Sequence, residues 1–266
     1  MPAIEIRTPG TWLELQDLLF GEPFKGYENP YHSGLIHRGM SRAEYTPMSS
    51  IERQGLFHAE THLLRNFQKY AREVGVPTER KWEWLAIGQH HGLPTRFLDW
   101  TYSPLVALHF ATENGDIEHD SAVWSLDYVR AHDRLPKEVK CALVDDATAF
   151  TTQMLDASGV DIAPDTGSDP RSAYLIVLEP PSLDDRIVNQ YAGLSALSST
   201  SVSTEAWLET FDEPIAVKIV IPAALKQEVR EKLDKSNINE RVIYPGLDGL
   251  SKWLGRYYST PKRTWI

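Results

Sequence analysis

The chain has 266 residues and a formal net charge of −10 at pH 7. Its composition, 42% hydrophobic and 24% charged, is ordinary for a globular protein and gives enough chain for a sizeable core. The single cysteine, Cys141, excludes an internal disulfide and any multi-cysteine metal site. The negative charge excludes a protein whose whole surface binds nucleic acid electrostatically, although a local basic cleft stays open.

The N-terminal sequence MPAIEIRTPG lacks the apolar run of a signal peptide. No uncharged apolar segment approaches the ~20 residues that a membrane-spanning helix needs. We therefore expect a cytoplasmic protein with no membrane contact.

Helices are predicted at four places in the first half of the chain. Thr11 to Glu14 fits a capping box, so a helix should cover residues 12–20 and stop at Gly21. Apolar residues recur at helical spacing in residues 57–75 and 79–92. Ser103 and Pro104 open a further helix, whose apolar residues cover most of its circumference.

Strand patterns occur in both halves of the chain, and strong ones return in the later part. The segments with this pattern are LIHRGM (35–40), SAVWSLD (121–127), AYLIVLEP (173–180) and PIAVKIVIP (214–222), and TRFLDWT (95–101) is short and extended. Residues 145–157 look helical within an ambiguous region, and helices are expected in residues 222–237 and 247–258. The sequence predicts one α+β domain with a helical N-terminal part and a β-rich later part.

An unusual group of polar residues lies between two helix breaks. His91, Thr95, Arg96, Asp99 and Thr101 follow one another where a glycine and two prolines interrupt the helices. One explanation is a packed corner with an internal arginine–aspartate pair and a core histidine. The other is a functional site, which we favour because buried charges are costly unless something requires them.

Arg38 ends an apolar strand beside Gly39, which permits close backbone approach. A guanidinium at this place suits a phosphate or a carboxylate. The alternative is an ion pair with an acid such as Glu60, which the start of a helix also favours. Gln190 lies just before a glycine in a loop, and its position alone does not indicate a function.

No metal site is expected. His90 and His91 are adjacent and should face different ways, and the helical pair His58 and His62 has no evident third ligand. The sequence contains no zinc-protease pattern, phosphate-binding loop, dinucleotide fingerprint or hydrolase nucleophile elbow. Lys226, Arg230 and Lys232 alternate with acids and predict a mixed solvated face.

Five segments occur in a distinctive order: HRG, LLRNF, WLAIGQHHGLPTRFLDWTYSPLVALHFAT, RIVNQYAG and IYPGLDGLSKWL. This order resembles the FRG domain family, named for a phenylalanine-arginine-glycine motif. The resemblance covers about residues 12–256, and we expect one FRG-type domain in residues 1–266. His37 stands in place of the family's aromatic residue, and Leu194 lies where a phenylalanine is common.

The family layout is in turn similar in outline to ADP-ribosyltransferases, which implies a split β-sheet with NAD as substrate. On this resemblance Arg38 and Gly39 form the first element of the NAD site, Thr101 the second and Gln190 the third. Because Gln190 is not an acid, Glu60 or Asp99 would have to supply a carboxylate. The resemblance implies catalytic roles for Glu60, His91, Asp99 and Gln190, and NAD-binding roles for Arg38, Gly39, Arg96, Trp100 and Thr101.

The expected activity is transfer of ADP-ribose from NAD to a macromolecule, such as a nucleic acid, or to a nucleotide, with NAD hydrolysis as the nearest variant. A toxin or antiphage effector would fit this activity, and would imply an antitoxin or immunity partner. Two alternatives stay open. One is a non-catalytic module that binds a nucleotide or a nucleic-acid end. The other is a nuclease-like hydrolase that uses His91, Glu60 and Asp99 as acid–base groups.

Overall fold

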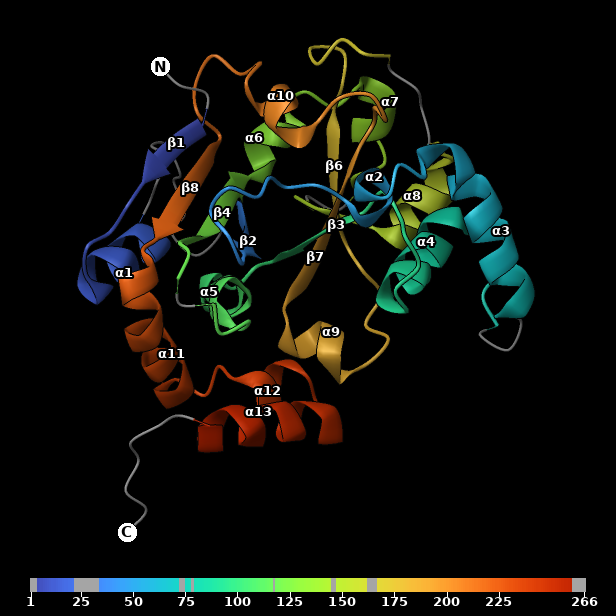
Figure 1. Cartoon of the computed structure of the whole chain (residues 1–266). Coiled ribbons are helices and arrows are strands. Elements are labelled where there is room, and N and C mark those ends of the chain that lie inside the picture. Colours follow the sequence, from blue (N-terminus) through green and yellow to red (C-terminus); the bar gives the residue numbers. More distant parts are fainter. Residues whose placement is uncertain are drawn as a thin grey trace.

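The computed structural model describes residues 4–21, 34–71, 75–77, 79–116, 118–144, 147–161 and 167–259. These residues form one mixed eight-stranded sheet with helices packed around it (Figure 1). The fold is therefore α+β, as the sequence predicts. None of the described helices is both long enough and apolar enough to cross a bilayer.

The sheet draws its strands from the whole chain. Its strands are β1 (Ile4–Arg7), β2 (Leu35–Met40), β3 (Leu98–Thr101), β4 (Ser121–Asp127), β5 (Phe150–Thr151), β6 (Leu175–Glu179), β7 (Ala192–Leu197) and β8 (Ala216–Ile221). They lie in the order β1-β8-β4-β2-β3-β7-β6-β5, and only the two outermost pairs are parallel. The helical N-terminal part thus also supplies three strands, two of them at the centre.

The described helices surround this sheet. They are α1 (Trp12–Phe20), α2 (Ser50–Arg53), α3 (Glu60–Tyr70), α4 (Lys81–His90), α5 (Pro104–Thr112), α6 (Tyr128–His132), α7 (Lys137–Lys140), α8 (Thr152–Ser158), α9 (Asp185–Asn189), α10 (Thr204–Leu208), α11 (Lys226–Lys235), α12 (Glu240–Ile243) and α13 (Leu247–Ser259). Short 3₁₀ turns precede α3 at Phe57–Ala59 and α11 at Ala223–Leu225.

Most of the predicted elements are confirmed, with informative differences. The side chain of Thr11 caps α1, but Glu14 returns to the backbone amide of Gly10 rather than completing a capping box. Helix α3 ends at Tyr70, before the predicted stop at Gly75. The segment 145–157 contains a short strand before its helix, and β1 and β7 were not predicted.

The sheet consists of two halves that are joined by very little backbone pairing. Strand β2 pairs with β4 along its whole length, and β3 pairs along its whole length with β7. Between β2 and β3, however, only His37 and Thr101 are in register. The two strands separate beyond this pair, so the sheet opens at its centre.

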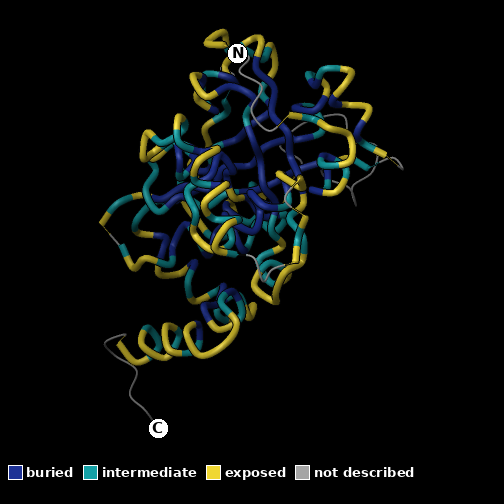
Figure 2. The backbone as a smooth tube through the Cα atoms, turned by 90° about the vertical axis from the view of Figure 1, so that its right-hand side faces the viewer, coloured by how far each residue is buried: buried dark blue, intermediate teal, exposed yellow. Residues whose placement is uncertain are grey.

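Side chains on the two faces of the sheet pack differently. One face carries a cluster that includes residues of both halves, among them Ile36, Trp100, Trp124 and Val177. On the opposite face there are two clusters, one involving α1, α5 and α11 and the other α3, α4 and α8. The buried strands run through the centre of the molecule in Figure 2. Two helical groups therefore flank the opening between β2 and β3.

Gly39 allows α5 to pack directly on β2. A Cβ atom built there would lie 2.0 Å from the carbonyl oxygen of Ala107 and 2.5 Å from the amide nitrogen of Ala111, both backbone atoms of α5. A side chain at this position would push the helix off the strand. The close backbone approach expected at Gly39 is thus made by helix α5. The residue also lines a cavity between β2 and β3, which is described below.

Gly39→Ala should lower the free energy of unfolding by about 3 kcal/mol, the upper end of the usual cost of overpacking. The matched control is Gly193→Ala, because its Cβ would meet the ring of Tyr102 at 3.4 Å, an ordinary contact. Urea denaturation of both variants measures the difference. Equal stability of the two variants would contradict the packing explanation.

Candidate functional site

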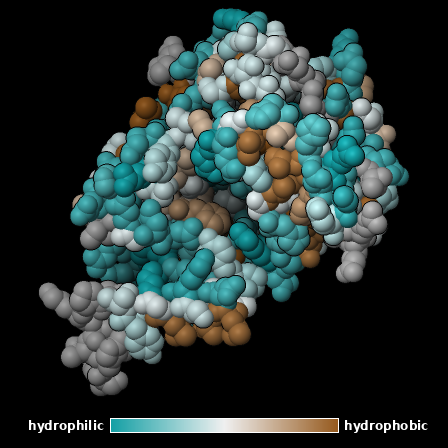
Figure 3. Space-filling model, turned by 45° about the vertical axis from the view of Figure 1, so that its right-hand side comes forward, coloured by the Kyte–Doolittle hydropathy of each residue, from teal (hydrophilic) through white to brown (hydrophobic). Residues whose placement is uncertain are grey.

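A cavity of about 540 Å³ lies at the opening between β2 and β3. Its walls come from both halves of the sheet and from α4, α5 and α9, and the surface is hollowed above the C-terminal helix (Figure 3). This size is within the range of small-molecule binding sites. We call this cavity the central cleft.

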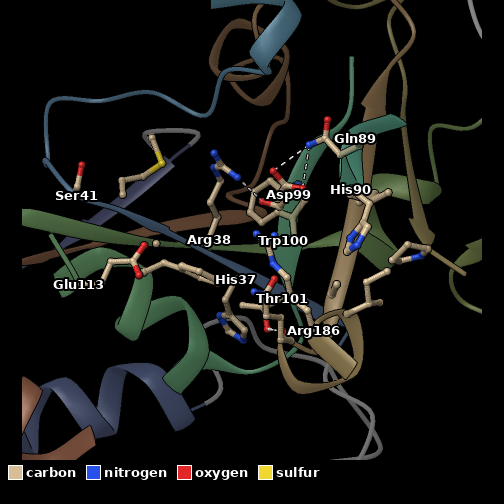
Figure 4. Close-up of a pocket in the computed structure, with 18 of the residues that line it drawn as sticks. His37, Arg38, Ser41, Gln89, His90, Asp99, Trp100, Thr101, Glu113 and Arg186 are labelled. Carbon is tan, nitrogen blue, oxygen red and sulfur yellow. Dashed lines mark hydrogen bonds between the residues drawn. The ribbon is translucent and has the colours of Figure 1, made fainter. Parts of the chain in front are cut away.

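Arg38 projects into the central cleft from β2. Its Nη1 donates a hydrogen bond of 2.5 Å to the backbone oxygen of Asp99 (Figure 4). Burial lowers the pKa of the Arg38 guanidinium, the charge of Asp99 raises it, and the charge of Arg53 lowers it again. The group stays protonated near neutral pH because an arginine titrates far above it. The alternative pairing of Arg38 with Glu60 does not occur in this structure, because Glu60 is paired with Arg96.

The side chains of Asp99 and Gln89 contact each other on the wall of the cleft. Nε2 of Gln89 donates to both carboxylate oxygens, at 2.9 and 3.0 Å. Oε1 of the same amide accepts a 2.6 Å bond from the hydroxyl of Thr95, which is fully buried. Thr95 thus orients the Gln89 amide, and the amide orients the Asp99 carboxylate toward the cleft. The Arg96–Asp99 pair of the alternative packed-corner explanation is not formed; Asp99 remains exposed and lines the cleft.

Trp100, Thr101 and Gln190 line the cleft but use their polar atoms for structure. Nε1 of Trp100 donates to the hydroxyl of Ser195 at 2.8 Å. The Thr101 hydroxyl donates to the backbone oxygen of Gln190 at 2.6 Å. Nε2 of Gln190 donates to the backbone oxygen of Ile243 at 3.1 Å, which ties the cleft to α12. The three residues are brought together as predicted, chiefly as walls of the site.

Glu60 and Arg96 lie apart from the central cleft. The Glu60 carboxylate accepts from the backbone nitrogen, Nε and Nη2 of Arg96, with the first two bonds at 3.0 and 2.8 Å. Both residues are buried, with exposed fractions of 5% and 6%, and neither lines the cleft. The two therefore neutralise each other within the packed interior, which removes them from the set of residues that can contact a ligand in the cleft.

His90, not His91, lines the central cleft. Its Nε2 lies 2.9 Å from a carboxylate oxygen of Asp184, just before α9. His91 is exposed, and its ring lies near those of His90 and Phe67. His90 is the last residue of α4 and His91 is its C-cap, so the two adjacent rings leave the end of the helix in different directions.

His37 was not predicted as a site residue, yet it lies in the cleft beside Thr101. Its Nδ1 is 2.8 Å from the hydroxyl of Ser125, its register partner on β4. Burial lowers the pKa of His37 to about 4, so the imidazole is neutral near pH 7. The period-two alternation of β2 was a usable signal, because residues 35, 37 and 39 share one face.

Glu113, directly after α5, is a second carboxylate in the cleft that the sequence did not reveal. One of its oxygens accepts a 2.8 Å bond from the Tyr244 hydroxyl and lies 3.4 Å from Nε2 of His109. Burial acts to raise the pKa of Glu113, but its interactions with His109, Tyr244 and Lys252 outweigh burial and leave the pKa below its usual range. Glu113 is therefore an ionised carboxylate at neutral pH.

Arginines supply an excess of cations in the cleft. Arg38, Arg53 and Arg186 line it, against the two carboxylates of Asp99 and Glu113. Within the described part of the chain, the guanidinium groups of Arg53 and Arg186 form no hydrogen bond or ion pair. Arg186 lies 5.5 Å from the ring of Tyr244. Unpaired guanidinium groups around a cavity favour an anionic ligand.

The central cleft thus depends mainly on one continuous part of the chain, from β2 to the end of α5. Residues 33–120 match the FRG domain. This match supports the family resemblance for the three motif segments within these residues, whereas RIVNQYAG and IYPGLDGLSKWL lie outside the matched range. The FRG segment contains Arg38, Gln89, Asp99, Thr101 and Glu113, whereas the wall made by α9 and β7 comes from outside it. No curated protein and no solved structure matches the chain.

Two further expectations concern other surfaces. In the described residues, no group of three or more histidine, cysteine, aspartate or glutamate side chains is arranged to hold a metal ion. The predicted solvated face of α11 is wrong for Lys226, which is buried and donates to the backbone oxygen of Asp116 at 2.8 Å. Arg230 is paired with Glu240.

Proposed function

We propose that the protein binds NAD in the central cleft and transfers its ADP-ribose group to an acceptor in the manner of an ADP-ribosyltransferase. The single observation that carries this proposal is the position of Arg38 at the point where the central strands separate. The resemblance to ADP-ribosyltransferases places the first NAD-binding residue on such a strand, in a sheet that splits beside it. The one-pair junction of β2 and β3 agrees with that expectation.

The charges of the cleft support a dinucleotide diphosphate as ligand. A phosphate accepts paired hydrogen bonds from a guanidinium, and these bonds are strong because both groups are charged. Arg38 keeps Nη1 on the backbone of Asp99, and its buried Nε has no hydrogen-bond partner among the described residues. The fixed guanidinium can therefore bind a phosphate with little further loss of side-chain freedom.

The chemistry requires negative charge near the sugar. Loss of nicotinamide leaves positive charge on the anomeric carbon of the ribose, and an oriented carboxylate stabilises it. Because Glu60 is bonded to Arg96 away from the cleft, Asp99 and Glu113 are the acids that can do this. Asp99 is the better oriented toward the cleft, through Gln89, while Glu113 is held against Tyr244. Gln190 contributes to the wall.

Nicotinamide release from NAD, measured with and without acceptor mixtures, tests the activity. The proposal requires release that Asp99→Asn or Glu113→Gln lowers by about two orders of magnitude, the usual size of one lost electrostatic interaction in a transition state. Saturable NAD binding without release would instead make the protein a recognition module. Absence of NAD binding would overturn the proposal.

Arg38→Gln should weaken NAD binding by about tenfold or more, because at least one charge-assisted bond to a phosphate is lost. Calorimetry measures the affinity, and the melting temperature verifies folding. Arg65→Gln is a suitable control, since Arg65 is exposed on α3 and does not line the cleft. Unchanged affinity in Arg38→Gln would remove this residue from the binding site.

A further inference from the structure

We infer that residues 38–53 form a subsite for the diphosphate group of the bound nucleotide. This inference deepens the proposed function, and it rests on that proposal only for the identity of the groups attached to the diphosphate. The segment runs from the end of β2 through a loop to α2, along one side of the cleft (Figure 4). Four polar side chains of this segment line the cleft, those of Arg38, Ser41, Tyr45 and Arg53.

These side chains present hydrogen-bond donors that nothing else uses. Among the described residues, the hydroxyls of Ser41 and Tyr45 and the guanidinium of Arg53 take part in no hydrogen bond or ion pair. Nε of Arg38 is buried without a hydrogen-bond partner. Buried polar groups are normally satisfied, so the unpaired Nε of Arg38 stands out. Ser41, Tyr45 and Arg53 are partly or largely exposed, and their donors are free to bind a ligand in the cleft without breaking a bond within the protein.

The charges of Arg38 and Arg53 also favour a diphosphate as the ligand of this segment. Arg53 lies close enough to Arg38 to lower the pKa of its guanidinium, so the two cations repel each other. Glu52, next to Arg53, accepts a hydrogen bond from the backbone nitrogen of Ser49 and does not line the cleft. Burial raises the pKa of Glu52, and the charge of Arg53 acts to lower it. A ligand with two linked anionic groups would give each guanidinium its own partner. A single carboxylate would satisfy only one of them.

Arg42 differs from the two arginines that line the cleft, because it is paired with acids. It belongs to the same segment, but its guanidinium lies 3.5 Å from carboxylate oxygens of both Glu44 and Asp116. It does not line the cleft. Thus the arginine of this loop that faces away is neutralised by acids, whereas Arg38 and Arg53, which face the cleft, lack an ion pair. Arg42 is therefore a matched control.

Calorimetric titration of the full chain with inorganic pyrophosphate, ADP and adenosine tests the subsite. Pyrophosphate and ADP should bind, and adenosine should bind about tenfold or more weakly than ADP because it lacks the charged groups. Arg53→Gln should weaken binding of pyrophosphate and of ADP by about tenfold, and Tyr45→Phe by about threefold. Arg42→Gln should change neither affinity by more than about twofold.

Equal affinity for ADP and adenosine, or wild-type pyrophosphate affinity in Arg53→Gln, would overturn the inference. Because Arg53 is exposed, its replacement should leave folding intact, and the melting temperature verifies this. Binding of ADP without nicotinamide release from NAD would reject the proposed reaction and leave the subsite standing. Normal NAD turnover with an unchanged KM in Arg53→Gln would reject the subsite and leave the proposed reaction standing.

Discussion

The free energy of unfolding should fall by about 3 kcal/mol between pH 6.5 and pH 4 through His132 alone, since burial lowers the pKa of this side chain from 6.5 to about 4. Nδ1 of His132 donates to the backbone oxygen of Thr148 at 2.9 Å, and Nε2 accepts from the backbone nitrogen of Val177 at 2.9 Å. A proton on Nε2 would face another N–H group and break the bond to β6.

The direction follows from proton binding in the two states. Between the folded and unfolded pKa values, the unfolded chain binds a proton at His132 that the folded protein does not. Stability is therefore complete above pH 6.5 and is lost as the pH falls toward 4. The hydrogen bond to Thr148 and the charge of Asp133 oppose the effect of burial, while the charge of Lys140 adds to it.

Urea denaturation of the wild type and of His132→Gln over this pH range measures the effect. Glutamine can keep a donor and an acceptor at the two positions but does not titrate. The variant should be less stable at pH 7, through lost ring contacts with Tyr128 and Phe150, and should show a flatter pH profile. Parallel profiles for the two proteins would contradict the role of His132, because other groups titrate alike in both.

Glu60→Gln should lower the free energy of unfolding by about 3–5 kcal/mol, the usual cost of breaking a buried ion pair. The neutral amide leaves the guanidinium of Arg96 charged in a site where only 6% of that residue is exposed. Because the pair lies outside the central cleft, the protein that remains folded should keep the nicotinamide-release activity proposed above.

Two controls separate the pair from a general effect of charge. Asp133→Asn removes one acid of the exposed pair with Lys140 and should change stability by less than about 1 kcal/mol. The double variant Glu60→Leu, Arg96→Met removes both buried charges and should recover much of the loss in Glu60→Gln. A stable Glu60→Gln protein without NAD binding would show that Glu60 acts in the site after all.

The sequence was most informative where local rules operate. Proline at position 104 and a serine cap before it define the start of α5, and alternation defines β4 over Ser121–Asp127. Strand β7 was missed because alanine, glycine and serine in residues 192–197 carry a weak strand signal. Its position comes from pairing with β3 and β6, which no local pattern reveals.

The site residues, too, divide into those that local sequence patterns indicate and those that only the tertiary structure reveals. Arg38, Asp99 and Thr101 were predicted from sequence and do line the cleft. Sequence spacing could not distinguish His90 from His91, because the difference is a rotation of about 100° around one helix. Glu113 and Arg53 gave no signal, since an acid after a helix and an arginine in a short polar helix are usually solvated.

By itself the sequence determined the kinds of groups available and the local elements that carry them: an arginine on a strand, an aspartate between proline breaks, and an apolar helix beside a glycine. The tertiary structure decided which of these groups meet. Arg96 pairs with Glu60 and Asp99 with Gln89 because the order of strands and the single register pair of His37 with Thr101 bring distant segments together. Side-chain partners depend on the relative position of whole elements, to angstrom precision, and the local pattern of residues does not contain that information.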